Sequence, residues 1–379
     1  MKISRDTLRG YILEEILAYL IRNTGYRLLV NDTQDPQELG WRNNGLVVKG
    51  RGGVHQVDVL GELSWVPAFT YPLRLFVEAK FRRLRTGIPE VRNMVATLLD
   101  VNQNNLPQMT REAGTNPQLR PKYYYAGAIF SASGFSVPAT DMALAHNVSL
   151  IDLKTPEFQP LLDAVTATAD LIVRKFAAPG DNDSEGEATD DEDENVPSGL
   201  ASPANHQSRS FFMLALRTAI RQQLKTLTQQ PRPAVLSLAA DLVPSLRTVV
   251  NAATGIGELF VGMGQGPYML VLKADNPAAF LNYAKTHLVH DVSITWTTED
   301  GTWQISPITQ TSPTPYSLSF RVPQPIRDWV FSSENVRRAA LDAKKLFFSN
   351  ICIFYSRNDR DLLIRLRFKP SDIRRRIEP

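Results

Sequence analysis

The chain has 379 residues, enough for two or three domains of ordinary size. Its 43% apolar and 21% charged residues are typical of a folded protein and exclude disorder of the chain as a whole. A single cysteine excludes an intrachain disulfide and a cysteine-rich zinc site. No run of about eighteen apolar residues occurs, so we expect no membrane partner.

The start of the chain predicts a helix and a cytoplasmic location. Apolar residues recur at helical spacing over residues 7–23, and Gly25 follows where a helix C-cap is expected. Glu14 and Glu15 interrupt the apolar pattern, which is atypical of a secretory signal peptide. We therefore expect a cytoplasmic protein.

The rest of the first domain, residues 1–177, alternates between strand and helix patterns. Strands are predicted at 26–30, 45–49, 54–63, 73–80, 123–130 and 148–153, and helices at 88–101 and 137–146. This order indicates an α/β domain in which helices cover a central mixed sheet.

Residues 178–208 are expected to form an acidic flexible linker. They contain almost no large apolar residue, so they cannot bury enough surface to offset the entropy of ordering. Nine acidic residues fall between Asp181 and Glu194 with no Lys or Arg, and outside this block the chain carries 42 basic and 30 acidic residues. The basic surplus suggests a polyanionic partner. Alternatively, the acidic block mimics nucleic acid and occupies a basic groove.

The pattern of residues 209–379 predicts an α+β domain, for which we expect a recognition, regulatory or oligomerisation role. Helices are expected at 211–227, 234–253 and 277–288, and from an N-cap at Ser333 to Phe348; strands are expected at 258–263, 268–273, 292–297, 301–305, 316–322, 351–356 and 361–368. The last strand alternates apolar residues with Arg365 and Arg367. DNA binding, a solvated surface and a protein-binding edge strand all fit this partly basic face.

Two carboxylates and a lysine stand out in the first domain. Asp58 lies inside the predicted strand 54–63, and the strand 73–80 ends in Glu78-Ala79-Lys80. Alternate residues of a strand share a face, so Glu78 and Lys80 should project together. Carboxylates are the hard oxygen ligands that Mg²⁺ prefers, and a lysine there would hold or polarise an attacking water.

This pattern resembles the PD-(D/E)xK nuclease signature, and its surroundings resemble the Mrr-like restriction endonuclease branch over about residues 8–155. The similar flanking segments are GGVHQVDV at 52–59, GAIFSASGFS at 127–136 and VSLIDL at 148–153. The resemblance implies a restriction-endonuclease-like layered domain and DNA cleavage that depends on Mg²⁺, with Mn²⁺ as a substitute. It also implies 5′-phosphate and 3′-hydroxyl ends and a role in prokaryotic restriction or antiviral defence.

The resemblance assigns roles to individual residues. Asp58 and Glu78 would bind metal, and Lys80 would assist the water. Glu14 matches a Glu on the opening helix that often joins the metal site in such nucleases; the competing interpretation is a solvated helix residue, as expected for Glu15.

Candidate DNA contacts lie on either side of this set: His55, Gln56, Arg82, Arg83 and Arg85. Arginine forks match phosphate oxygens, although an ordinary solvated turn explains the arginines equally simply. A structural hydrogen bond is the competing interpretation for His55. The branch often has smaller residues at 55 and 56 and Gln at the position of Glu78, so substrate details do not carry over.

Other functions fit the same residues. A structure-selective repair or junction nuclease would use this constellation, and a non-catalytic subunit could keep the fold as a DNA- or protein-binding module. A homodimer could cut both strands, and the second domain or a partner subunit of a defence system would gate the activity.

Overall fold

The structure is a computed structural model that describes residues 4–22, 24–42, 45–66, 70–103, 122–176, 243–256, 259–264, 269–296, 301–309, 315–322, 324–357 and 360–369. The chain falls into two compact units, Met1–Ile16 with Gln159–Ala253 and Leu17–Phe158 with Thr254–Pro379. The predicted linker and the predicted helix 211–227 lie outside the described residues, so the division at 178–208 stays a prediction. No described helix is long and apolar enough to cross a membrane.

The first unit combines helices from distant parts of the sequence. It contains most of α1 (Arg5–Arg22), which confirms the predicted opening helix, together with α4 (Gln159–Phe176) and α7 (Val243–Ile256). The carboxylate of Asp170 on α4 forms an ion pair with Arg5 at 2.9 Å and a longer one with Arg9 at 3.5 Å. The sequence did not predict α4. α7 overlaps the predicted helix 234–253, whose residues 234–242 lie outside the described residues.

In the second unit, a five-stranded sheet has the order β1 (Tyr26–Leu29), β5 (Val59–Leu63), β6 (Leu73–Lys80), β7 (Tyr124–Ser131) and β8 (Ser149–Asp152). The first three strands pair antiparallel and the last three parallel. The predicted mixed sheet is therefore confirmed.

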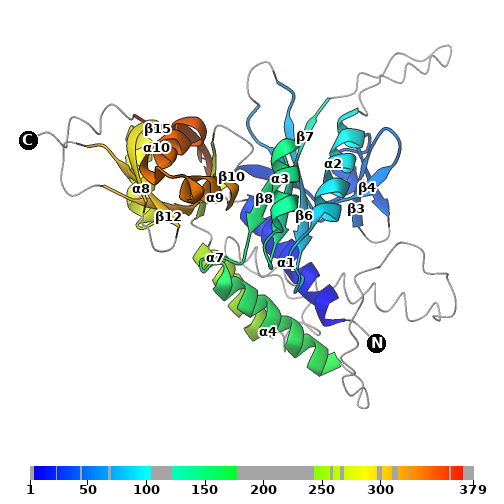
Figure 1. Cartoon of the computed structure of the whole chain (residues 1–379). Coiled ribbons are helices and arrows are strands. Elements are labelled where there is room, and N and C mark those ends of the chain that lie inside the picture. Colours follow the sequence, from blue (N-terminus) through cyan, green and yellow to red (C-terminus); the bar gives the residue numbers. More distant parts are fainter. Residues whose placement is uncertain are drawn as a thin grey trace, which may run out of the picture. The chain divides into compact units, whose positions relative to one another are not determined.

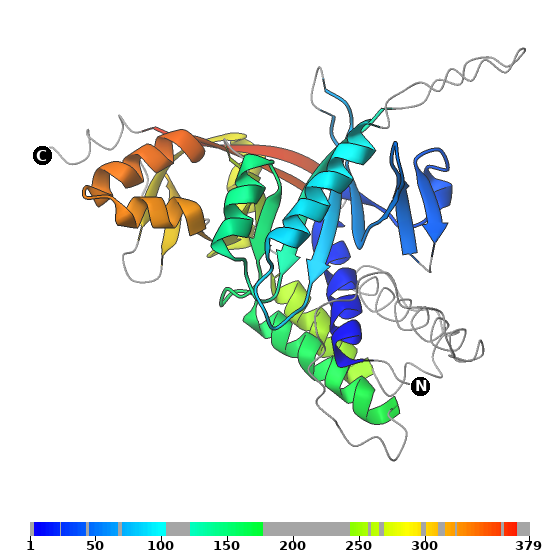
Figure 2. The same ribbon diagram turned by 45° about the vertical axis from the view of Figure 1, so that its right-hand side comes forward.

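Helices cover this sheet on both faces (Figures 1 and 2). On one face α2 (Ile88–Gln103) and α3 (Val137–Ala145) share a buried core with Leu60 and Phe76. On the other face lies the end of α1, residues 17–22, which belongs to the same unit; a Cβ on Gly61 of β5 would lie 3.2 Å from the Ile21 side chain.

A smaller antiparallel sheet consists of β2 (Leu39–Arg42), β3 (Gly45–Lys49) and β4 (Val54–Gln56). The prediction of one strand over 54–63 was therefore wrong. β4 pairs with β3, β5 pairs with β1 and β6, and the chain crosses between the two sheets at Val57 and Asp58. Asp58 lies in this break and not inside a strand.

The second unit also contains a closed seven-stranded barrel in the order β10-β13-β12-β11-β15-β14-β9. Its strands are β9 (Leu259–Met263), β10 (Met269–Ala274), β11 (Val289–Trp296), β12 (Thr302–Pro307), β13 (Leu318–Arg321), β14 (Asn350–Arg357) and β15 (Arg360–Phe368). β15 lies between β14, its antiparallel hairpin partner, and β11, which it joins in parallel. The predicted strands and terminal hairpin are confirmed, and the α+β composition is as expected.

Three helices accompany the barrel: α8 (Pro277–Thr286), α9 (Gln324–Ser332) and α10 (Val336–Phe347). The predicted N-cap at Ser333 was wrong. Asn335 caps α10 by accepting a hydrogen bond from the Arg338 amide at 3.0 Å, because the preceding helix α9 extends to Ser332.

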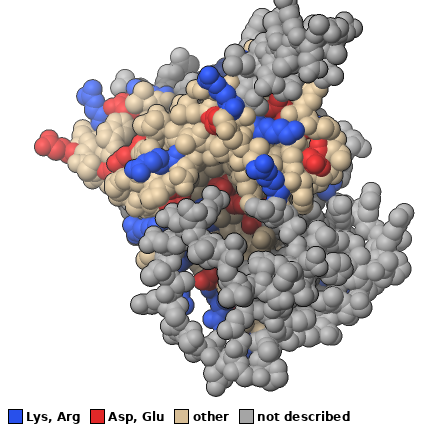
Figure 3. Space-filling model, turned by 90° about the vertical axis from the view of Figure 1, so that its right-hand side faces the viewer, with Lys and Arg blue, Asp and Glu red and all other residues tan. Residues whose placement is uncertain are grey.

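The basic face predicted for the last strand is largely paired within the protein. Arg365 donates to the Asn350 side chain at 2.7 and 2.9 Å, while Arg367 and Lys369 both pair with Asp291. Elsewhere, the molecular face in Figure 3 shows basic and acidic side chains interspersed. Net charge alone therefore does not define a nucleic-acid surface.

Candidate functional site

Asp58 meets the Glu-x-Lys segment at the end of β6. The β5–β6 pairing ends at Val59 opposite Val77, and beyond it the Asp58 side chain accepts a hydrogen bond from the Ala79 amide at 2.7 Å. A backbone donor at the end of the strand pairing is thus satisfied by a carboxylate. The structure therefore brings Asp58 to the residue between Glu78 and Lys80.

Glu78 and Lys80 project together, as predicted from their spacing. The Lys80 ammonium lies 2.6 Å from a carboxylate oxygen of Glu78, and the two side chains are 20% and 28% exposed. Both sit at the edge of the sheet core, since Glu78 is level with buried Ile129 of β7. The pair is accessible to a ligand and partly shielded from water, which strengthens charge interactions.

Asp58 and Glu78 supply oxygen donors of the type that magnesium prefers. The Asp58 carboxylate accepts from the backbone amide of Ala79, the residue that follows Glu78, so two carboxylates lie near the same end of β6. Mg²⁺ is commonly held by one or two carboxylates and completes its shell with water and phosphate oxygens. Within the described part of the chain no group of three or more His, Cys, Asp or Glu residues that could hold a metal ion is found.

The remaining predicted ligand lies on α1. Glu14 is half-buried and belongs to the portion of the helix in the first unit, so its participation in the metal site stays a prediction. Its neighbour Glu15 is 4% exposed, which contradicts the expectation of a solvated residue. Glu15 occupies the buried face of the helix with Ile12 and Ile16.

His55 makes the structural hydrogen bond that was its competing interpretation. Its Nε2 lies 2.7 Å from the carboxylate of Asp100 on α2, and its Nδ1 lies 3.4 Å from the Thr97 hydroxyl. The hydrogen bond from His55 is the main reason that the pKa of Asp100 is lowered. Contact between His55 and DNA is untested and would have to compete with these bonds.

Asp100 also holds the glycine-rich loop before β4. Its two carboxylate oxygens accept from the Gly52 and Gly53 amides at 2.7 and 3.2 Å. A Cβ on Gly50 would lie 1.9 Å from the same carboxylate, so the loop and the α2 side chain fit only because residue 50 has no side chain. The sequence analysis missed Asp100, which lies 45 residues from His55.

Gln56 belongs to the small sheet. It pairs with Val47 in β3, and its amide covers Gly45, where a Cβ would lie 3.1 Å from Nε2. Gln56 is exposed, and a contact with DNA stays a prediction.

The three predicted arginines lie in residues 81–87, here named the arginine loop, between β6 and α2. Arg82 pairs at 2.7 Å with Glu90, whose other oxygen accepts from the Gly87 amide at the start of α2. Arg83 and Arg85 are exposed. Their side chains therefore face solvent a few residues beyond Lys80.

Buried hydroxyls fix the backbone of the arginine loop. The Ser133 hydroxyl donates to the Leu84 carbonyl, the Thr86 hydroxyl donates to Ser131 at 2.8 Å, and the Thr86 amide donates to Gly134 at 2.9 Å. Ser131 and Thr86 are at most 1% exposed. The small-residue segment 131–136 thus anchors the loop, a role that its sequence pattern did not reveal.

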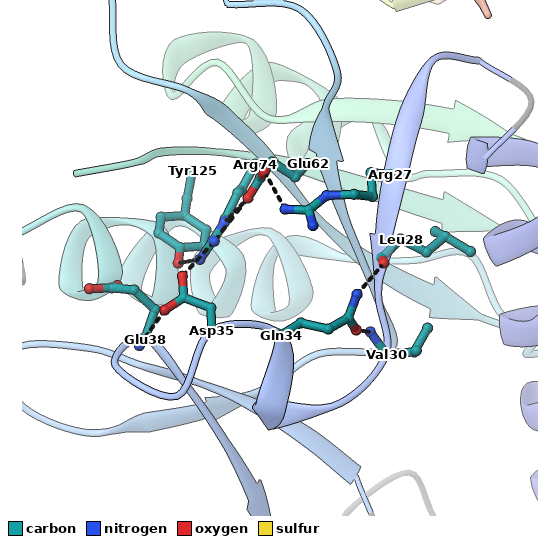
Figure 4. A network of polar contacts seen from close by, with 9 residues as sticks. All are labelled: Arg27, Leu28, Val30, Gln34, Asp35, Glu38, Glu62, Arg74 and Tyr125. Atoms are coloured by element: carbon teal, nitrogen blue, oxygen red, sulfur yellow. Dashed lines mark hydrogen bonds and ion pairs between the residues drawn. The ribbon is translucent and has the colours of Figure 1, made fainter. Parts of the chain in front are cut away.

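A second buried polar cluster lies near the other end of β6 (Figure 4). Arg74, 1% exposed, donates to Asp35 at 2.6 Å, to Glu62 at 2.9 and 3.0 Å and to the Tyr125 hydroxyl at 3.0 Å. Glu62 also pairs with the more exposed Arg27. Glu78 follows Arg74 by four positions in β6, so this cluster lies on the strand that carries the site but outside the site.

Comparisons with known proteins do not assign a family. No protein-family model and no curated protein matches the chain. A solved structure titled "Crystal Structure of Protein of Unknown Function AF1548" is similar at 14% identity over 56% of this chain and 97% of that chain, with a TM-score of 0.27. A likeness this weak supports no inference about fold or activity.

Proposed function

We propose that this chain is a Mg²⁺-dependent DNA endonuclease whose first domain has a restriction-endonuclease-like fold. The observation that supports it is the meeting of Asp58, Glu78 and Lys80 at one end of β6, held by the hydrogen bond from Ala79 to Asp58. The mixed sheet with helices on both faces is compatible with that layered fold.

Each of the three residues has a distinct task in this proposal. Asp58 and Glu78 hold the metal ion, which when bound supplies positive charge to the phosphate oxygens. Lys80 donates a hydrogen bond to the attacking water and stabilises negative charge that develops on the phosphate. Because the Lys80 ammonium is paired with Glu78, it is already held beside the carboxylate that binds metal.

The biological role follows from the resemblance of residues 8–155 to Mrr-like nucleases. We propose restriction or antiviral defence in a prokaryotic cytoplasm, with gating by residues 209–379 or by a partner subunit. A homodimer would allow both strands to be cut, and Mn²⁺ would substitute for Mg²⁺.

Cleavage of supercoiled plasmid tests the activity. Methylated and unmethylated plasmids are incubated with the full chain in Mg²⁺ or EDTA, comparing wild type with Lys80→Ala and with Lys345→Ala, an exposed lysine of α10. We expect metal-dependent nicking or linearisation by wild type and Lys345→Ala, with a loss of at least about a hundredfold in Lys80→Ala.

Two results would contradict the proposal. Equal cleavage by Lys80→Ala would place the activity elsewhere or in a contaminant. If wild type neither cleaves DNA nor binds Mg²⁺ in a calorimetric titration, the chain is a non-catalytic binding subunit.

A further inference from the structure

Leu84 is the most exposed large apolar side chain of the described residues, at 68%. It lies at the centre of the arginine loop, between the exposed Arg83 and Arg85. Single exposed leucines are common on protein surfaces. This one is distinguished by its cationic neighbours and by its position four residues after Lys80.

The loop that carries Leu84 is held in place. On one side the Lys80 carbonyl accepts from the Ala132 amide at 2.9 Å, and on the other the Thr86 carbonyl accepts from the Ser136 amide at 3.0 Å. Between them the carbonyl of Leu84 itself is bound by the Ser133 hydroxyl. An apolar side chain projects from an anchored backbone and does not fold back onto the core.

We infer that Leu84 is a wedge that enters a base step of duplex DNA while Arg83 and Arg85 contact the flanking phosphates, so that the duplex is distorted beside the cleavage site. The inference rests on the proposed nuclease function and adds a mode of substrate recognition to it.

The chemistry of the loop supports a nucleic acid as the occupant. Proteins that kink DNA commonly insert apolar side chains, leucine among them, between base pairs. Arginine forks on both sides match the phosphates that border such a step. An apolar protein partner would have to bury both guanidinium groups, which is costly without acidic partners.

Proximity to the candidate active site gives the wedge a function. Four residues span at most about 14 Å, so a duplex that contacts Leu84 is also within reach of Lys80. Partial unstacking costs a few kcal/mol per base step. A duplex that is already distorted avoids this cost, so a wedge enzyme should bind mismatched or bent sites more tightly than regular ones.

The test uses the full chain and a short duplex with 2-aminopurine, whose fluorescence rises when it is unstacked. Binding is measured with Lys80→Ala as the parent, so that the DNA stays intact. Leu84→Ala and Leu84→Met are compared with Leu99→Ala, a control leucine that is 57% exposed on α2. Cleavage of the same duplex is measured separately with Lys80 restored.

We expect the parent, Leu84→Met and Leu99→Ala to raise the fluorescence, and Leu84→Ala to leave it unchanged. Leu84→Ala should weaken binding to the regular duplex by about tenfold, and by much less when a mismatch is present, because the base step is then already open. Leu84→Met keeps a flexible apolar side chain that can act as a wedge. If it raises the fluorescence while Leu84→Ala does not, the effect of Leu84→Ala is loss of the wedge and not a folding defect.

Three results would overturn the inference. If wild type cleaves DNA but Leu84→Ala and Leu99→Ala give the same fluorescence and the same affinity, the wedge role of Leu84 is excluded and the nuclease proposal stands. If wild type neither binds nor cleaves DNA, the wedge inference and the nuclease proposal are both excluded. A changed molecular mass in sedimentation for Leu84→Ala, with unchanged DNA affinity, would make the loop a protein interface.

Discussion

The guanidinium of Arg74 lies over the ring of Tyr123, with its central carbon 3.3 Å from the ring centre. The same guanidinium is bound by Asp35 and Glu62, so a full positive charge is enclosed by an aromatic face and two carboxylates. Charges buried in this way are tolerated because each is paired and hydrogen-bonded.

Removal of Arg74 should therefore destabilise the protein strongly. Arg74→Leu leaves Asp35 and Glu62 without their shared cation, and we expect a loss of about 3–5 kcal/mol in the free energy of unfolding by urea. Arg27 gives a matched control, since it binds the same Glu62 from a side chain that is 58% exposed. Arg27→Ala should cost less than about 1 kcal/mol. Equal effects would mean that the enclosure of Arg74 is not what stabilises the cluster.

Two substitutions of Asp58 should distinguish its structural role from its proposed metal-binding role. Asp58→Asn keeps an oxygen that can accept from the Ala79 amide but loses the charge, so we expect near-normal thermal stability with Mg²⁺ binding and cleavage abolished. Asp58→Ala also loses the hydrogen bond and should reduce the free energy of unfolding by about 1–3 kcal/mol. Calorimetric titration with Mg²⁺ and thermal denaturation check both. Full Mg²⁺ binding by Asp58→Asn would exclude this carboxylate as a ligand.

The buried histidine of the barrel should make its stability depend on pH. His290 is 1% exposed; its Nε2 lies 2.7 Å from the His287 carbonyl and its Nδ1 lies 2.5 Å from the Tyr316 hydroxyl. Nε2 therefore carries the proton and Nδ1 accepts from Tyr316. Burial lowers the pKa of His290 below its ordinary value of 6.5.

The sign follows from proton uptake on unfolding. Because the pKa of His290 is higher in the unfolded chain, that chain binds more protons in mildly acidic solution. This part of the stability is complete above about pH 6.5 and is lost as the pH falls below it. Urea unfolding between pH 5 and 8 should show the decline, and His290→Gln should reduce it. An NMR titration of His290 with a midpoint above 6.5 would contradict the prediction.

Gly50 and Gly53 offer a sharp comparison in the loop around Asp100. Gly50→Ala would place a Cβ 1.9 Å from the Asp100 carboxylate, whereas the nearest atom to a Cβ at Gly53 is 3.9 Å away. We expect Gly50→Ala to displace Asp100 from His55 and to destabilise the protein by about 1–3 kcal/mol. Gly53→Ala should stay within about 1 kcal/mol of wild type. The His55 resonance in NMR would report loss of the hydrogen bond to Asp100 in the first variant alone.

Local pattern predicted β6 to its last residue, because the run Leu75-Phe76-Val77 leads directly into Glu78 and Lys80. The break at Asp58 escaped prediction, since residues 54–63 read as one strand and only pairing with two different sheets divides them. Ser333 and Asn335 are equally good N-caps by type, and the end of α9 selects Asn335.

The candidate site was predictable only in part, because several of its contacts join residues that are far apart in the sequence. The spacing of Glu78 and Lys80 is local, so their shared direction could be predicted. The bond from His55 to Asp100 joins residues 45 apart, and the anchor from Thr86 to Ser131 also spans 45 residues. Such contacts depend on the packing of α2 and the 131–136 segment, which no local period encodes.

The closure of the barrel by β14 and β15 also sets an order of events during synthesis. The first five barrel strands in the sequence form an open sheet with β9 and β11 at its two edges, and only residues 350–368 join these edges. A ribosome adds about 5–20 residues per second. Until this hairpin has left the ribosome, β9 and β11 lack these two neighbours, and unpaired strand edges are sites at which another chain can pair and aggregation can begin.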